Sequence, residues 1–234
     1  MKLIQRQGYL DFLRRNRNRP IVKVVSGIRR CGKSTLFRLF KDELLSEGIK
    51  PEQIISINFE ELEYEHLRDY HALYQYILER MQPDEMNYIF LDEIQHVDQF
   101  HRVVDSLFVK ENTDLYITGS NAYFMSSDIA TLLTGRYVEI QMLPLSFSEF
   151  YYSKFDGNQY SLIPAYESYL RESSFPYTQQ LGGEDFDIQE YLRGLYNTLL
   201  LHDVVARLKI SDVTILQDIV RYIMSNIGSL LSPN

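Results

Sequence analysis

The stretch "SGIRRCGKST" (26–35) follows the apolar run "IVKVV" and places two glycines, a lysine and two hydroxyls at fixed offsets. Gly27 and Gly32 can adopt backbone conformations in which successive amides turn inward and form an anion-binding nest. Lys33 adds a positive charge, Ser34 adds a hydroxyl ligand for Mg²⁺, and the helix that follows contributes the positive end of its dipole. The stretch therefore predicts a cradle for nucleotide phosphates.

The spacing of this stretch fits the P-loop pattern G-x-x-x-x-G-K-[ST], and it lies after a strand and at the start of a helix, as the motif requires. The alternative is an ordinary glycine-rich turn between a strand and a helix. The predicted ligands are ATP and Mg²⁺. The loop residues predicted to bind the nucleotide are Gly27, Ile28, Arg29, Arg30, Cys31, Gly32, Lys33, Ser34 and Thr35.

The chain of 234 residues has one cysteine, Cys31, which excludes an intramolecular disulfide framework and a zinc site built on cysteines. Cys31 lies inside the P-loop, at a predicted helix N-terminus, with Arg29, Arg30 and Lys33 nearby. These positive groups predict a lowered thiol pKa and a reactive thiol that bound ATP protects from alkylation.

Apolar runs alternate with helical patterns through the first part of the chain. Strands are predicted at 21–27, 54–59, 88–93, 115–120 and 137–143, and helices between them at 34–48, 66–81 and 99–111. This alternation predicts an α/β fold with a five-stranded, mostly parallel, doubly wound sheet. Ligands are then expected at the carboxyl ends of the strands.

Helical patterns replace the strand signal after about Pro144. Amphipathic helices are predicted at 187–208 and 213–228. We expect a core domain over residues 1–150 and a small helical lid subdomain over 151–234.

Two acids end the third predicted strand, in "NYIFLDEIQ" (87–95). At this position Asp92 would hold Mg²⁺ through a water molecule, and Glu93 would polarise the attacking water. A second acid directly after the first favours a hydrolase over a simple nucleotide switch. The alternative is a pair of exposed acids at a strand end.

The fourth predicted strand ends in "YITGSNA". A polar side chain here would lie between the acidic pair and the γ-phosphate, so Ser120 or Asn121 could orient the attacking water. A turn or a helix cap is the alternative, since both residue types are preferred there.

The net charge of −8 is unevenly distributed, because residues 1–41 carry +11 and residues 42–234 carry −19. The basic segment is either a DNA-binding face or a surface that is solvated or paired with the acidic part of the chain. The 18 tyrosines could stack bases, but most have the spacing of helix packing. No run of eighteen apolar residues and no signal-peptide pattern occurs, so a cytoplasmic location without a membrane segment is expected.

The order of the P-loop, "FLDEIQ", "TGSNA", "LLTGRY" and "LPLSFSEF" closely resembles the predicted AAA+ superfamily ATPases of bacteria and archaea. This group is a branch of the additional-strand P-loop NTPases related to the origin-recognition ATPases. The match covers residues 20–150 well. The resemblance implies a five-stranded core with Walker A, Walker B and sensor 1 on neighbouring strand ends, then a helical lid. In that family a winged helix and a nuclease-like domain usually follow.

The resemblance assigns roles to matching residues. Gly27 to Thr35 correspond to Walker A, Asp92 and Glu93 to Walker B, and Ser120 and Asn121 to the sensor 1 region. Arg136 corresponds to a candidate arginine finger, acting in cis or from a neighbouring protomer of a homo-oligomer, or else it pairs with one of the chain's acids. The family often has Gly-Gly-Phe-Pro in the lid where this chain has Ser-Ser-Phe-Pro at 173–176. Lid contacts and a sensor 2 arginine, for which Arg193 is a candidate, are therefore not carried over.

The expected function is Mg²⁺-dependent ATP hydrolysis coupled to conformational work, with DNA as a candidate target. The alternative is a nucleotide-dependent switch with slow turnover that binds a protein partner. A small-molecule kinase is disfavoured by the sensor strand. The ending "GSLLSPN" has a helix-start signal at Ser232 and Pro233, so a chain truncated before a winged helix, with slow turnover on its own, is expected.

Overall fold

The computed structural model describes residues 4–120, 133, 135–155, 160–181, 185–199, 204–205 and 212–229. Their contacts divide the chain into two compact units, Met1–Gln180 and Leu181–Asn234. Each unit is described by itself below. The predicted boundary at residue 150 stays a prediction.

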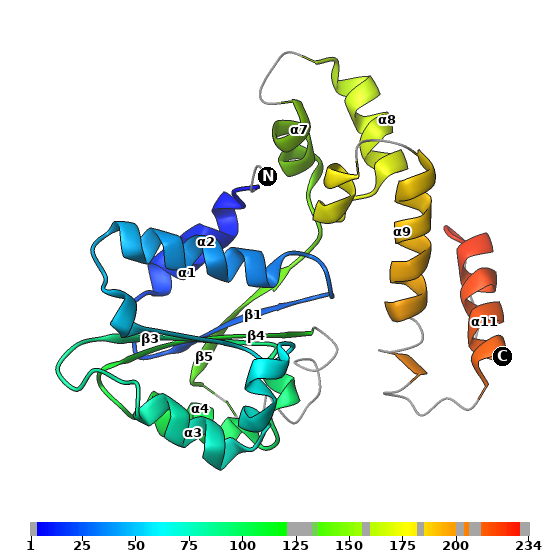
Figure 1. The fold of residues 1–234 in the computed structure, drawn as a ribbon. Helices are drawn as coiled ribbons and strands as arrows, with labels where there is room; N and C mark the ends of the chain where they lie inside the picture. Colours follow the sequence, from blue (N-terminus) through cyan, green and yellow to red (C-terminus); the bar gives the residue numbers. More distant parts are fainter. Residues whose placement is uncertain are drawn as a thin grey trace. The chain divides into compact units, whose positions relative to one another are not determined.

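The first unit is built on a five-stranded sheet in which every neighbouring pair is parallel. The strand order is β2-β3-β4-β1-β5, and Figure 1 shows the sheet between two layers of helices. This confirms the predicted α/β fold with a parallel sheet. The strands are β1 (Val22–Gly27), β2 (Ile54–Asn58), β3 (Asn87–Asp92), β4 (Thr113–Ser120) and β5 (Tyr137–Met142).

Alternate residues of the strands serve the two faces of the sheet. Tyr88 and Phe90 of β3 pack in one core cluster with residues of α1 (Gln7–Asn16) and α2 (Lys33–Ser46). Ile89 and Leu91, their neighbours, pack in the other cluster with α3 (Tyr70–Leu78) and α4 (Phe100–Phe108). A fully buried strand on both faces is typical of a doubly wound sheet.

The predicted helix at 66–81 is divided in the structure. Residues Leu62–Arg68 form a 3₁₀-helix, η2, and α3 begins only at Tyr70. The break occurs at Asp69, which has extended backbone and accepts a hydrogen bond from the Ala72 amide (2.9 Å) as an N-cap. The capping carboxylate starts a new helix, so the apolar periodicity alone misplaced its beginning.

The first unit continues beyond the sheet into helices that the sequence pattern did not delimit. They are α7 (Phe147–Phe155), α8 (Leu162–Glu172) and η4 (Pro176–Gln180). Further 3₁₀-helices lie at η1 (Pro51–Gln53) and η3 (Ile94–His96).

The second unit contains α9 (Asp185–Thr198) and α11 (Val213–Ser225). These correspond to the two helices predicted at 187–208 and 213–228, although most of the segment from 200 to 211 lies outside the described residues. Among the helices that the structure describes, none has the length and apolar character needed to cross a bilayer.

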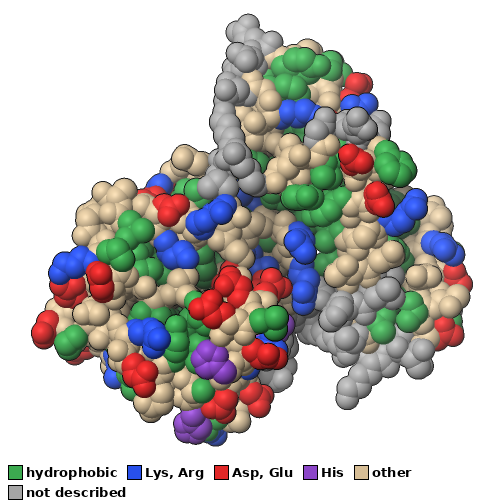
Figure 2. All heavy atoms as spheres, viewed as in Figure 1, with side chains coloured by type: hydrophobic (Ala, Val, Ile, Leu, Met, Phe, Trp, Pro, Cys, Tyr) green, Lys and Arg blue, Asp and Glu red, His purple; other side chains and the backbone are tan. Residues whose placement is uncertain are grey.

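Basic residues near the N-terminus pair with acids from later in the chain. On the face of the first unit shown in Figure 2, basic and acidic side chains are interspersed. This is the arrangement expected if the basic segment pairs with the chain's own acids. The pairs are Arg6–Glu149, Arg14–Glu43, Arg17–Glu47, Lys23–Asp114 and Arg29–Glu60.

Candidate active site

The loop between β1 and α2 has the backbone that a phosphate nest requires. Gly32 has a φ of 106° and Arg30 a φ of 67°, both in the left-handed region. A Cβ atom on Gly27 would lie 2.4 Å from the carbonyl oxygen of Met142 and 2.9 Å from Sγ of Cys31. Only glycine therefore fits at position 27, where the loop leaves the sheet.

Lys33 opens α2 and its side chain is only 3% exposed. Its ammonium donates hydrogen bonds to the carbonyl oxygens of Gly27 (3.1 Å) and Ile28 (3.4 Å). It also lies 3.0 Å from Oε1 of Glu93. The structure thus brings the predicted phosphate-binding lysine and the predicted catalytic carboxylate into direct contact.

Glu93 directly follows β3 and has a φ of 56°. This value lies in the left-handed region, which residues other than glycine rarely adopt. Its amide donates to Oγ1 of Thr118 (2.9 Å), and its second carboxylate oxygen accepts from Nε2 of Gln95 (2.5 Å). Such strained positions cluster at functional sites because surrounding contacts hold them in place. Here those contacts direct the Glu93 carboxylate at Lys33.

Asp92 is the last residue of β3 and is 7% exposed. Burial raises the pKa of its carboxyl above the usual value, and hydrogen bonds with Ser34 and Thr118 oppose that shift. The Ser34 hydroxyl and the Asp92 carboxylate thus lie together as a pair of hard oxygen donors. Mg²⁺ prefers such oxygens and is commonly held by one or two carboxylates plus phosphate. The residues present therefore fit a Mg²⁺–nucleotide complex.

Within the described part of the chain, no group of three or more His, Cys, Asp or Glu side chains is placed to hold a metal ion.

Thr118 was not identified from the sequence. It donates a hydrogen bond to Oδ1 of Asp92 and accepts one from the Glu93 amide. One hydroxyl thus fixes both residues of the acidic pair. The available signal was a threonine within the apolar run of β4, the strand that neighbours β3.

Cys31 differs from its prediction. The residue is fully buried, and burial raises the pKa of its thiol, with the charges of Lys33 and Arg6 opposing the shift. Its side chain packs in the apolar cluster with Leu36 and Met142. The predicted lowered thiol pKa is therefore wrong, because desolvation outweighs the nearby positive charges.

Ser120, one of the two predicted sensor residues, is the last residue of β4. Ser120 is paired in register with Gly27 on the neighbouring strand, next to the P-loop. Asn121 lies outside the described residues.

Arg136 directly precedes β5, at the end of the sheet where the parallel strands begin and opposite the end that carries the P-loop. Its carbonyl oxygen accepts from the Val22 amide, where β1 begins (2.8 Å). The five residue steps from Val22 to Gly27 correspond to about 16 Å along a strand. The guanidinium contacts Asp105 on α4 (2.6 Å). The structure therefore does not bring Arg136 to the site of its own chain.

Two cavities adjoin the P-loop. The larger, of about 1100 Å³, is lined by the segment before α1, by Cys31 and Gly32, and by residues of α2, α7 and η4. The smaller, of about 440 Å³, is lined mainly by polar side chains that include Ser34, Lys41 and Asp92. Burial lowers the pKa of Lys41, and the charge of Asp92 opposes that shift. Arg193 lies on α9 in the second unit.

Comparison with known families gives one family match. A family model described as an AAA domain matches residues 19–151. Two curated relatives are similar over most of this chain. An uncharacterized protein of Haemophilus influenzae is 37% identical over 99% of this chain and 58% of its own length. An uncharacterized protein of Methanocaldococcus jannaschii is 30% identical over 88% of this chain and 47% of its own length. The chain thus spans about half the length of these relatives.

Solved structures with a similar fold include the Walker-type ATPase of Pyrococcus abyssi. It has a TM-score of 0.55 and 15% identity, covering 94% of this chain and 76% of that one. The ORC1 protein of Aeropyrum pernix, solved in complex with DNA, has a TM-score of 0.50 and 13% identity over 87% of this chain and 68% of that one. At these identities the likeness is one of fold.

Proposed function

Because the chain belongs to the AAA domain family of AAA+ superfamily ATPases, we propose that it binds ATP with Mg²⁺ and hydrolyses the terminal phosphate. The observation that carries this proposal is the buried contact of 3.0 Å between Lys33 and Glu93. It joins a phosphate-binding lysine to a carboxylate that can act as a general base. The same contact lies beside the oxygen donors Ser34 and Asp92.

In the bound state, the loop amides and the N-terminus of α2 hold the phosphates. Lys33 reaches the β- and γ-phosphates, and Ser34 with Asp92 holds Mg²⁺. The metal, when bound, supplies positive charge that neutralises the transferring phosphoryl group. The cavity of about 1100 Å³ beside Gly32 is large enough for the base and ribose. Ile28, Arg29, Arg30, Cys31 and Thr35 contribute backbone or flanking contacts.

For hydrolysis, the Glu93 carboxylate takes a proton from water as the water oxygen attacks the γ-phosphorus. The bond between the γ-phosphorus and the β–γ bridging oxygen breaks, and ADP and phosphate leave. Phosphate oxygens that approach Lys33 compete with Glu93 for the ammonium and so free the carboxylate for this step. Ser120 or Asn121 orients the water.

Arg136 is proposed to act in trans. A side chain at the opposite edge of the sheet, about 16 Å along the strand from the P-loop, can supply charge only to the site of a neighbouring protomer. Its contact with Asp105 is exposed on both sides, and exposed ion pairs are weak. In a homo-oligomer, the phosphates of ATP bound to a neighbouring protomer can therefore replace Asp105 as the partner of the Arg136 guanidinium at a small cost in free energy.

Coupling to DNA is a further proposal. The nucleic acid would be contacted by segments that correspond to the parts of the longer relatives not spanned by this chain. Because the basic N-terminal residues pair with acids, we expect the chain alone to bind DNA weakly and in a salt-sensitive way. Slow turnover by this chain alone is expected because Arg136 can supply its charge only to the site of a neighbouring protomer.

The experiment measures ATP hydrolysis with and without Mg²⁺, and with and without DNA, for the unmodified protein, Lys33→Ala and Glu93→Gln. We expect slow, Mg²⁺-dependent hydrolysis that both substitutions abolish. Hydrolysis that is unaffected by either substitution would contradict the proposal.

A slow nucleotide switch is the second candidate function, favoured by the hold that Lys33 and Gln95 exert on Glu93. Glu93→Gln separates the two. A motor loses its biological activity together with hydrolysis, whereas a switch stays fixed in its ATP-bound, partner-binding form.

A further inference from the structure

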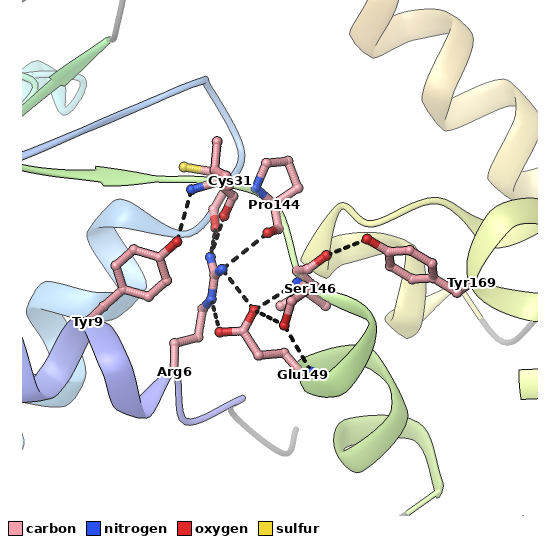
Figure 3. A network of polar contacts seen from close by, with 9 residues as sticks. Arg6, Tyr9, Cys31, Pro144, Ser146, Glu149 and Tyr169 are labelled. Carbon is pink, nitrogen blue, oxygen red and sulfur yellow. Dashed lines mark hydrogen bonds and ion pairs between the residues drawn. The ribbon is translucent and has the colours of Figure 1, made fainter. Parts of the chain in front are cut away.

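Arg6 lies just before α1 and is 5% exposed. Its Nε donates to Oε1 of Glu149 (2.9 Å), and its Nη2 donates to Oε2 of the same carboxylate (2.9 Å). Its Nη1 donates to the carbonyl oxygens of Cys31 (3.2 Å) and Leu143 (2.6 Å), and Nη2 donates to that of Pro144 (3.1 Å). Figure 3 shows this guanidinium at the meeting point of the three segments. One side chain thus joins the N-terminal segment, the P-loop and the connection from β5 to α7.

The contact with Cys31 fixes the direction of a P-loop amide. A trans peptide unit is planar and its C=O and N–H groups point in opposite directions. No cis peptide occurs in the described part of the chain. With the Cys31 oxygen held by Arg6, the N–H of Gly32 points away from Arg6. Gly32 is the last loop residue before α2, where the amides of a P-loop face the phosphates.

Glu149 holds two structures at once. Its Oε2 accepts a hydrogen bond from the Ser146 amide (2.8 Å), and its own amide donates one to Oγ of Ser146 (3.2 Å). These two reciprocal bonds form a capping box at the start of α7. The same carboxylate takes the bidentate pair from Arg6. Burial raises the pKa of the Glu149 carboxyl, but hydrogen bonds from Arg6 and Ser146 outweigh it and lower the pKa. The pair is therefore ionised.

Tyr9 supports the guanidinium from α1. The charged carbon of Arg6 lies 4.4 Å from the centre of the Tyr9 ring, and the Tyr9 hydroxyl accepts a hydrogen bond from the Leu143 amide (3.2 Å). The guanidinium is thus packed on one face and bonded at its edges, which leaves it little freedom to move.

We propose that Arg6 is a positioning residue for the phosphate-binding loop, which orients the Gly32 amide through the Cys31 carbonyl and ties the loop to the start of α7. This role rests on the proposed ATP binding. It predicts that loss of Arg6 lowers the affinity for every ligand that places phosphates in the nest, whether or not the ligand carries a base.

The test uses Arg6→Met combined with Glu149→Gln. This pair of substitutions leaves no unpaired buried charge, and Gln keeps the capping box with Ser146. The probes are ADP and inorganic pyrophosphate, measured by calorimetry. We expect the thermal unfolding temperature to stay close to that of the unmodified protein, while both probes bind about tenfold more weakly, as expected for the loss of a charge-assisted hydrogen bond.

The matched control is Arg14→Gln combined with Glu43→Gln. Arg14 and Glu43 also form a bidentate pair (2.6 and 2.7 Å), but between α1 and α2 at the surface. This control should bind both probes like the unmodified protein. If the folded Arg6/Glu149 variant binds both probes within about twofold of the unmodified protein, or loses affinity for ADP alone, the positioning role is wrong.

Arg6→Lys provides the test if the double variant does not fold. Lysine keeps the charge but cannot form the fork with Glu149 and the carbonyl bonds together, so pyrophosphate should bind at least about threefold more weakly. Unchanged pyrophosphate affinity in this folded variant overturns the role of Arg6. Lys33→Ala separates this outcome from failure of the proposed function. If Lys33→Ala also binds pyrophosphate normally, the nucleotide site itself is wrong.

Discussion

Replacing Glu93 by Gln removes one charge from a buried pair and keeps the side-chain size. Glu93 and Lys33 are 7% and 3% exposed and lie 3.0 Å apart. An arriving phosphate must take Lys33 from this carboxylate. A hydrogen bond to a charged group contributes about 1.5–3 kcal/mol, so removing the competing charge should tighten ATP binding by about tenfold. Because the general base is lost as well, hydrolysis should fall by about 10²- to 10⁴-fold.

The assay combines calorimetric titration of ATP with single-turnover hydrolysis, both in excess Mg²⁺. The control is Glu85→Gln, which removes the same charge from a surface pair with Lys50 and should change neither quantity. A Glu93→Gln protein that hydrolyses ATP at the unmodified rate refutes the role of Glu93 as the base. Unchanged or weaker ATP binding refutes the competition for Lys33.

Further predictions concern the loop, the thiol and the neighbouring strand. Gly27→Ala should lower the free energy of unfolding by about 1–3 kcal/mol through overpacking, as measured by urea unfolding. Gly8→Ala, with open space around position 8, should not be destabilised. Equal stability of the two variants would contradict the close approach of the Met142 carbonyl oxygen to Gly27. Cys31 should react with a thiol reagent only at the rate of unfolding, with or without ATP, and rapid labelling of the native protein would contradict its burial. Thr118→Val should raise the Mg²⁺ concentration needed for hydrolysis, and an unchanged Mg²⁺ requirement would count against its hold on the acidic pair. Arg136→Ala should abolish the dependence of the specific hydrolysis rate on protein concentration, and a mixture with Lys33→Ala should restore turnover; a fully active Arg136→Ala protein would show that no finger is needed.

The P-loop and the acidic pair could be predicted because their chemistry is local in the sequence. The positions of Lys33 and Glu93 follow from a short spacing and from a strand that ends in acids. The parallel sheet then brings these strand ends to one edge, and the structure adds the direct contact.

Other features depend on contacts between distant segments. Arg6 and Glu149 are 143 residues apart, and no local pattern links them. Thr118 acts on β3 only because β4 is its neighbour in the sheet. Cys31 was misjudged because its charged sequence neighbours were visible in the sequence, whereas its burial depends on how α2 and β5 pack around it.

The most direct test of the central claim is calorimetric titration of ATP, with Mg²⁺, into the unmodified protein and into Lys33→Ala. Lys50→Ala serves as the control, since Lys50 is an exposed lysine paired with Glu85, and circular dichroism checks that each protein is folded. We predict that the unmodified protein and Lys50→Ala bind ATP with equal affinity and that Lys33→Ala binds at least about a hundredfold more weakly, as expected for a buried charged contact to phosphate. A folded Lys33→Ala protein that binds ATP as tightly as the unmodified one would contradict the assignment of this loop as the nucleotide site.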